Sequence, residues 1–115
     1  MTQTLEGFRL MAVMRELNDV WNGMPLNVAR LFIAIAQAED RGEPLTVTDA
    51  AKEAEMNMAT ASRNIQLLSF KMAERGSEPL GLVDVKAARA DYRSKVVILT
   101  PKGKQLWERL CSHVR

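Results

Sequence analysis

The chain has 115 residues, enough for one domain with its own core, and its apolar (47%) and charged (26%) contents are ordinary for a globular protein. No apolar run approaches the roughly 18 residues of a membrane span, the N-terminal residues show no signal-peptide pattern, and the single cysteine excludes an internal disulfide, so we expect a cytoplasmic protein. The net charge of +2 conceals an asymmetry: residues 1–56 carry nine acids against five basic residues, and residues 57–104 carry nine basic residues against four acids. The basic half indicates either a polyanionic partner or a solvated surface.

The first predicted element is an amphipathic helix over about Thr4–Trp21, ended by Gly23-Met24-Pro25. Its apolar residues recur at steps of three and four, which places them on one face: Leu10, Met14, Leu17, Val20 or Trp21, and Met24. Such a stripe packs either on its own domain or on a second subunit, and the pattern does not separate the two.

The next segment predicts two helices with a loop between them. Asn27–Gln37 reads as a helix with Asn27 as its N-cap, and the loop that follows ends at Pro44. The apolar segment Leu45–Val47 is too short to assign and is compatible with a small edge strand. Thr48 then resembles the N-cap of a short, alanine-rich helix.

A longer helix is predicted over about Met58–Arg75, with Asn57 as its N-cap. One face is apolar, and the other is polar and free of acids in its first turns; the latter comprises Thr60, Ser62, Arg63, Asn64 and Gln66. A short helix, a tight turn and a longer helix with a polar outer face form a helix-turn-helix.

Two strands and a last helix complete the chain. Leu82–Lys86 alternates apolar and polar residues, 87–93 is a charged turn region, and Lys95–Leu99 has high β-propensity. Thr100 caps the last helix, with Pro101 at its first position. We therefore predict an α+β, mainly helical fold: a winged helix-turn-helix with a two-stranded wing and flanking N- and C-terminal helices. It forms a single domain over 1–115, divided into an N-terminal helix (1–24), a core (26–104) and a C-terminal helix (101–115).

Three motifs in this order resemble the MarR family of bacterial transcriptional regulators. "ATASRNIQLL" (59–68) is similar to the family's recognition helix, "GLVDV" (81–85) to the start of its wing, and "DYRSKVVILTPKG" (91–103) to its Asp-x-Arg wing, strand and Leu-Thr. The resemblance covers roughly Leu26–Leu110. It departs from the family in a few extra residues before the wing and in one C-terminal helix where the family has two. Such trimming would fit a phage- or plasmid-borne regulator, and we expect the N-terminal helix to supply more of the dimer contacts.

The recognition helix and the wing supply the predicted DNA-binding residues. On the helix, polar donors can reach phosphates and base edges, and the helix N-terminus suits a phosphate. In the wing, the resemblance implies that Arg93 enters the minor groove and that Asp91 holds the loop, with Arg89 as a competitor for the groove. The alternatives are a solvated polar face and an exposed Asp91–Arg93 ion pair. The predicted set is Asn57, Thr60, Ser62, Arg63, Gln66, Arg89, Asp91, Tyr92, Arg93 and Lys95.

We expect a homodimeric repressor that binds double-stranded DNA and reads a pseudo-palindrome. The predicted dimer interface comprises Leu10, Met14, Leu17, Trp21, Leu106 and Leu110. Two alternatives remain open: a winged helix that binds a protein, for instance a phage protein with a host factor, and a ligand-responsive sensor, although no residue specifies an effector.

No pattern indicates catalysis, a cofactor or a metal. Nucleophile–base sets, phosphate-binding loops and paired carboxylates are not recognisable in the sequence, so we do not expect an enzyme. Cys111 lies on the apolar face of the last helix and is expected to be a packed thiol. His113 has no companion at ligand spacing, and we expect no metal site.

Overall fold

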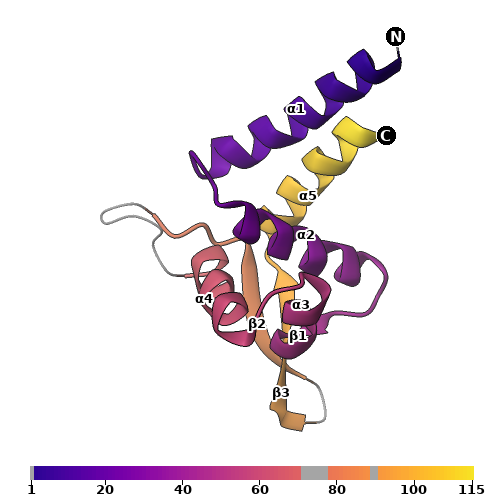
Figure 1. The fold of residues 1–115 in the computed structure, drawn as a ribbon. Coiled ribbons are helices and arrows are strands. Elements are labelled where there is room, and N and C mark those ends of the chain that lie inside the picture. The colour runs from indigo at the N-terminus through magenta and orange to yellow at the C-terminus, as the bar shows by residue number, and fades with distance from the viewer. Residues whose placement is uncertain (1, 71–77, 89–90) are drawn as a thin grey trace.

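The chain folds into five helices and a three-stranded antiparallel sheet within the residues that the computed structural model describes, namely 2–70, 78–88 and 91–115 (Figure 1). In chain order the elements are α1 (Thr2–Val20), α2 (Leu26–Asp40), β1 (Leu45–Thr46), α3 (Val47–Glu53), α4 (Met58–Leu68), β2 (Val83–Ala88), β3 (Asp91–Leu99) and α5 (Pro101–Val114). This order confirms the predicted α+β, mainly helical winged helix.

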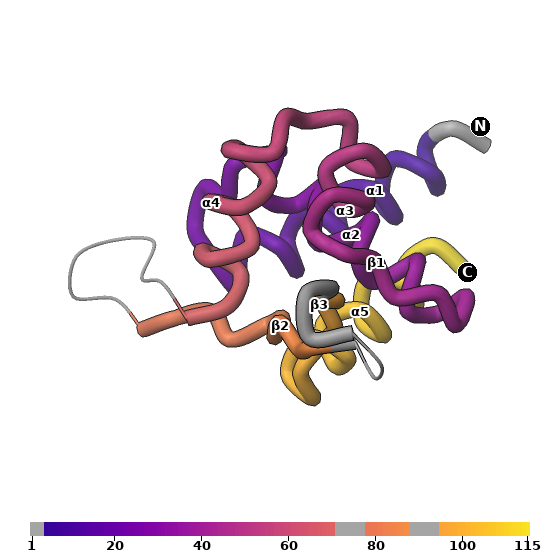
Figure 2. Tube along the Cα trace, turned by 90° about the horizontal axis from the view of Figure 1, so that it is seen from below, coloured from indigo at the N-terminus to yellow at the C-terminus, as the bar shows by residue number. Residues whose placement is uncertain are grey.

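Helix α2 lies at the centre of the core. Leu31, Phe32 and Ile35 on this helix are fully buried, and α3, α4, β3 and α5 all pack against it. Burying a side chain of this size stabilises the fold by about 1.5–3 kcal/mol relative to leaving it exposed. Helices α3 and α4 and the β2–β3 hairpin lie at the end of the molecule opposite to the one where α1 and α5 project (Figure 1). Figure 2 views the molecule from this lower end.

Strand β3 is central in the sheet, with β1 and β2 antiparallel on either side. Val97 on β3 is fully buried and is paired with Leu45 on one side and Val85 on the other. The short segment that the sequence left open is therefore an edge strand, and the two-stranded wing extends from a three-stranded sheet.

Both wing strands are longer than the sequence predicts. Strand β2 is Val83–Ala88 rather than Leu82–Lys86, and β3 begins at Asp91 rather than Lys95. In this outer part of the ladder Ala87 pairs with Lys95 and Ala88 with Asp91. Ala87 and Lys95 are both exposed, so burial imposes no alternating apolar pattern there. A register shift follows Ala87 in this outer part.

Two predicted N-caps are wrong. Helix α3 is capped by Thr46 and not by Thr48, because β1 ends there and Thr46 Oγ1 accepts a hydrogen bond from the Asp49 backbone N–H at 3.1 Å. Helix α2 begins after Pro25, whose carbonyl accepts the first helical hydrogen bonds. Asn27 consequently lies inside α2 and does not cap it.

The predicted start of α5 is confirmed. Thr100 Oγ1 accepts a hydrogen bond from the Gly103 backbone N–H at 3.1 Å, and Pro101 occupies the first turn. The same hydroxyl donates to the carbonyl of Gly81 at 2.6 Å. The cap therefore also ties α5 to the segment that leads into β2.

Helix α4 ends at Leu68, well before the predicted end at Arg75, which lies outside the described residues. The backbone N–H groups of Gly81 and Leu82 donate to the carbonyls of Ser69 and Leu68 at 2.9 and 2.8 Å. The last carbonyls of the helix are thus satisfied by a segment distant in sequence, which the local pattern does not reveal.

Helix α1 packs along α5, and both project from the body (Figure 1). Glu16 on α1 joins the two helices, because its carboxylate accepts a hydrogen bond from Arg109 Nε at 2.7 Å and lies 3.6 Å from His113 Nε2. The Arg109 hydrogen bond, aided by His113, lowers the pKa of Glu16. None of the described helices is long and apolar enough to cross a membrane.

Candidate nucleic-acid interface

The helix-turn-helix consists of α3, the turn 54–57 and α4. The turn is a Schellman motif, in which Met56 N–H donates to the Ala51 carbonyl at 2.9 Å and Glu55 N–H to the Lys52 carbonyl at 3.1 Å. Glu55 has φ of 55°, in the left-handed region that favours glycine. Backbone hydrogen bonds and a strained residue therefore set the angle between α3 and α4.

An arginine from α2 completes this turn. Arg30 Nη2 donates to the carbonyl of Ala54, the C-cap residue of α3, at 2.6 Å, while Nη1 donates to Asn27 Oδ1 at 3.2 Å. A cation at a helix C-terminus also interacts favourably with the helix dipole. No local pattern in the sequence marks Arg30 for this role, because the contact joins residues far apart in the chain.

Asn57 caps α4 as predicted. Its Oδ1 accepts a hydrogen bond from the Thr60 backbone N–H at 2.8 Å. Thr60 is partly buried, so its side chain is less available to a partner than the exposed residues of the same helix. The cap fixes the start of the helix, where free N–H groups suit a phosphate.

Helix α4 buries one face and exposes the other. The buried residues are Ala61, Asn64, Ile65 and Leu68, and the exposed ones are Met58, Ala59, Ser62, Arg63 and Gln66. The structure thus brings Ser62, Arg63 and Gln66 together at helical spacing, as predicted. Asn64 was expected on the outer face; it points inward, and its amide contacts the sulfur of Met56 at 4.0 Å.

The wing is formed by β2 and β3 and extends beyond α4 (Figure 1). Lys95 on β3 is exposed, as is Lys86 on β2, which the sequence prediction omitted although its outward position in an alternating strand marks it. Of the other predicted wing residues, Arg89 lies outside the described residues. Asp91, Tyr92 and Arg93 lie on β3, and their side chains are outside the described part.

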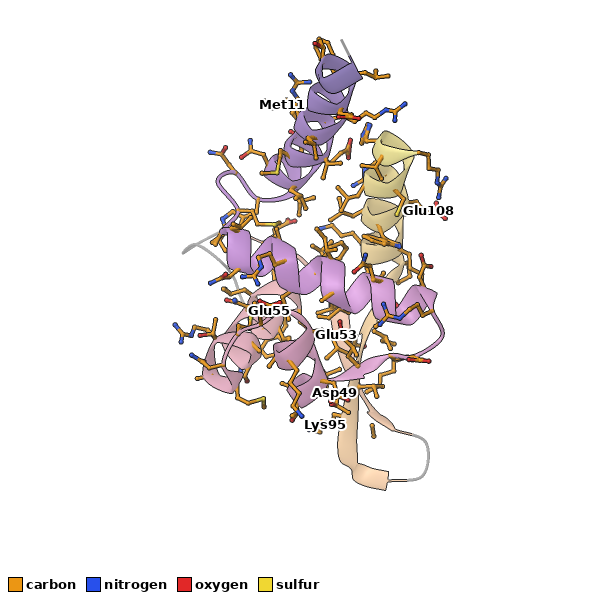
Figure 3. The ribbon with its side chains drawn as sticks, turned by 45° about the vertical axis from the view of Figure 1, so that its right-hand side comes forward. Met11, Asp49, Glu53, Glu55, Lys95 and Glu108 are labelled. Carbon is orange, nitrogen blue, oxygen red and sulfur yellow. The ribbon has the colours of Figure 1, made fainter. Side chains whose placement is uncertain are left out.

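The charge around the helix-turn-helix is mixed. Asp49, Glu53 and Glu55 are exposed on α3 and the turn (Figure 3). Lys52 on α3 is exposed as well. Helix α4 carries one charged side chain, Arg63. Among the described residues, positive charge at this end therefore comes from α4 and the wing, while α3 adds mainly acids.

The predicted dimer residues fall into two groups. Leu10 and Met14 on α1 are 64% and 53% exposed. Leu17, Leu106 and Leu110 are buried in the core of the same chain, and Trp21 is partly buried against it. The stripe predicted on α1 thus divides between packing within the chain and an exposed apolar surface.

A cavity of about 670 Å³ lies between α1 and α2. Its wall is mostly apolar, and its charged members are two arginines, Arg15 and Arg30. The sequence analysis did not find this cavity, because it depends on how α1 is placed over α2.

Cys111 and His113 lie on α5. Cys111 is partly buried and borders a small apolar pocket with Trp107 and Val13, in keeping with a packed thiol. His113 lies near Glu16, as described above. Within the described ranges, no three His, Cys, Asp or Glu side chains gather where they could hold a metal ion.

Comparison with known proteins identifies solved structures of similar fold. No protein-family model and no curated protein matches the sequence. The fold resembles a transcriptional regulator from Thermotoga maritima (TM-score 0.69, 14% identity, 97% of this chain and 68% of that one). It also resembles a MarR-like transcriptional regulator from the same organism (TM-score 0.65, 20% identity, 91% and 69%).

A third solved structure is BpsR of Bordetella bronchiseptica, whose DNA binding is regulated by 6-hydroxynicotinic acid (TM-score 0.58, 21% identity, 99% and 74%). The similarity in each case extends over nearly the whole of this chain, from α1 to α5. The chain therefore has the winged-helix fold of MarR-family transcriptional regulators.

Proposed function

We propose that the protein is a transcriptional regulator that binds double-stranded DNA sequence-specifically as a homodimer and acts as a repressor. The exposed stripe of Ser62, Arg63 and Gln66 on α4 carries this proposal, because it is polar, free of acids and presented by a capped helix beside a wing. A helix of this kind fits the major groove of B-DNA.

In this arrangement α4 reads bases and the wing contacts the flanking groove. An arginine such as Arg63 can donate two hydrogen bonds to guanine O6 and N7, and Gln66 can bond both N6 and N7 of adenine. We propose that the exposed Lys86 and Lys95 contact phosphates. In the wing we propose Arg93 for the minor groove, with Arg89 as the competing candidate, and Asp91 and Tyr92 as residues that support the tip.

We propose a dimer because α1 exposes apolar side chains that a second copy would cover. Two copies related by a two-fold axis would place their α4 helices in successive major grooves. The half-sites would then lie about 34–36 Å apart, one turn of the double helix.

Selection of bound duplexes from a random pool, followed by titration at several salt concentrations, tests the proposal. The logarithm of the binding constant should fall linearly with the logarithm of the salt concentration. Arg63→Ala should weaken binding by about 1–3 kcal/mol and relax the preference at one base pair of each half-site. Arg9→Ala, which removes an arginine from α1 far from α4, serves as the control and should change neither.

If no duplex is enriched, or if binding is insensitive both to salt and to Arg63→Ala, the DNA-binding proposal is wrong. The winged helix would then be better described as a protein-interaction module. The acids on α3 would in that case belong to a surface that binds a protein.

The cavity between α1 and α2 favours an additional property, namely a response to a small-molecule ligand. Its apolar wall with two arginines and no carboxylate matches an organic anion with an apolar body. Regulation of DNA binding by such an anion in BpsR lends support by analogy.

A further inference from the structure

The exposed face of α4 begins with two apolar residues. Met58 and Ala59 stand exposed in its first turn, and Met58 is 46% exposed, so that about half of its surface is free for a partner. The polar residues of the same face, Ser62, Arg63 and Gln66, follow later in the helix. A single exposed apolar side chain is ordinary on a protein surface. Two adjacent ones at the start of the helix proposed to enter the major groove suggest an apolar contact with DNA.

Helical geometry sets the order of these side chains around α4. Successive residues are turned by about 100° around the helix axis. Ala59 consequently lies near the middle of the exposed face, between Ser62 and Arg63 and within about 20° of Gln66, whereas Met58 and Arg63 lie at its two edges. The first side chain at the centre of this face is therefore short, and it lets the backbone approach a partner closely.

The start of α4 holds Ala59 in a defined place. Asn57 Oδ1 accepts a hydrogen bond from the Thr60 backbone N–H at 2.8 Å, and the Asn57 carbonyl accepts one from the Ala61 N–H at 2.9 Å. Ala61 is fully buried, and α2 and α3 both pack against α4. Ala59 lies between these anchored residues, so its methyl group is presented at a fixed position.

A methyl group on this face matches one feature of the major groove. Thymine presents a methyl group there, at C5, while the other groups on the base edges are mainly hydrogen-bond donors and acceptors. The N-terminal residues of a recognition helix are those that face the base edges. The side chain of Ala59 has no donor or acceptor, so it gains free energy only by burying apolar surface, and the thymine methyl group supplies such a surface.

We propose that Ala59 is a specificity-determining residue whose side chain contacts the 5-methyl group of one thymine in each half-site, with Met58 covering the contact from the side. This inference rests on the proposed function, because it requires α4 to lie in the major groove. Ala59 precedes Arg63 by four residues, about 6 Å along the helix axis, which corresponds to about two base pairs. With allowance for the length of the arginine, the thymine lies within about three base pairs of the pair that Arg63 contacts.

The experiment changes single methyl groups in the selected duplex and measures the affinity of the full chain. Uracil in place of thymine removes the methyl group and keeps the base pair, so a scan of all thymines locates the one that matters. Cytosine and 5-methylcytosine at that position form a second pair that differs only in a methyl group. Thymines between the two half-sites are the control. Each duplex is titrated with the wild type, Ala59→Gly and Met58→Ala.

We expect uracil at one thymine of a half-site to weaken binding of the wild type about fourfold, the equivalent of burying one methyl group. Uracil between the half-sites should have no effect, and 5-methylcytosine should bind about fourfold more tightly than cytosine. Ala59→Gly should bind the thymine and uracil duplexes equally. Any general loss from its lower helix propensity is common to both duplexes and cancels in their ratio. Met58→Ala should retain a preference for the methyl group.

Several outcomes would overturn the inference. They are a selected site without thymine within about three base pairs of the pair that responds to Arg63→Ala, a scan in which no uracil weakens binding, and an undiminished uracil effect in Ala59→Gly. If Met58→Ala abolishes the effect and Ala59→Gly does not, the contact belongs to Met58 and the assignment to Ala59 is wrong. A chain that binds no duplex refutes the proposed function and the inference together, whereas binding without a methyl effect refutes the inference alone.

Discussion

Gly103 in the first turn of α5 lies directly against the carbonyl oxygen of Leu82, so close that a Cβ at position 103 would overlap that oxygen. The oxygen is fixed, because it also accepts a hydrogen bond from the Thr100 backbone N–H at 3.0 Å. Glycine is required here for close approach of two backbones rather than for a left-handed conformation. The contact binds α5 to the residue just before β2, the first wing strand.

Gly103→Ala should therefore destabilise the protein by about 1–3 kcal/mol, the usual cost of overpacking against atoms that cannot move freely. Urea unfolding followed by circular dichroism measures it. Gly7→Ala is the matched control: Gly7 lies in α1 with no atom near its missing Cβ, so the same change should stabilise the chain by about 0.5–1 kcal/mol through helix propensity. If the two substitutions changed the free energy of unfolding equally, the close contact with Leu82 would not be the reason that position 103 requires glycine.

Glu55→Gly should stabilise the protein, because glycine adopts the left-handed conformation of this turn without strain. The gain should be about 1 kcal/mol. Glu55→Ala removes the same carboxylate but keeps the side-chain carbon, so it should not show this gain. The difference between the two variants in thermal unfolding isolates the backbone term, and a difference near zero would mean that Glu55 is not strained.

Much of the fold could be predicted because helix caps and helical spacing involve residues that are close together in the sequence. The caps Asn57 and Thr100 are polar residues that bond an N–H three positions later, and the apolar spacing of α2, α4 and α5 follows the helical period. Thr46 was missed although it stands three residues before Asp49, as an N-cap should. Thr48 offered an equally good side chain, and the pairing of β1 with β3 decided between them.

The features that the sequence did not predict depend on contacts between distant segments. The end of α4 is set by Gly81 and Leu82, the cavity by the placement of α1 over α2, and the role of Arg30 by the position of Ala54. For the candidate site, residue types on α4 were sufficient to select the exposed polar stripe, except that burial moved Asn64 to the inner face.

Glu16→Gln should lower stability at neutral pH and change its pH dependence. Arg109 holds the pKa of Glu16 below its ordinary value. The ionised carboxylate therefore stabilises the fold in full at pH values above the ordinary pKa. This contribution is lost as the pH falls through the lowered pKa. Because Arg109 is half exposed, the effect should stay below about 1 kcal/mol. His113 also faces this carboxylate.

Thermal unfolding between neutral and acidic pH measures this effect. The difference in melting temperature between the wild type and Glu16→Gln should be constant near neutral pH. It should disappear below about pH 4, where carboxyl groups ordinarily take up protons. Glu6→Gln makes the same change at an exposed position of α1 and serves as control. A gap that persists unchanged into acid would exclude the ionised carboxylate as its cause.

The dimer prediction depends on the exposed apolar surface of α1. The apolar side chains of this helix are not confined to one face, so the single apolar stripe expected from the sequence is weak. Yet α5 and the core cover only part of it, and five large side chains remain more than half exposed: Leu5, Phe8, Leu10, Met11 and Met14. In an isologous dimer the same patch of both copies forms the interface, so these side chains would be covered in each copy.

Leu10→Asp should shift the chain toward monomer in sedimentation velocity at micromolar concentration, because it places a charge in an apolar interface. Asn22→Asp adds the same charge at an exposed residue just after α1 and should leave the dimer intact. Leu17 is unsuitable for this test, since it is buried in the core and its replacement would unfold the chain. A wild-type chain that is already monomeric under these conditions would contradict the prediction.

Binding to one or two half-sites extends the test to DNA. A monomeric Leu10→Asp variant keeps α4 and the wing, so its affinity for a duplex with one half-site should match that of the wild type. On a duplex with both half-sites it should lose the additional affinity that linkage of two recognition helices provides. Equal loss on both duplexes would instead indicate damage to the fold, and no loss on either would mean that each copy binds alone.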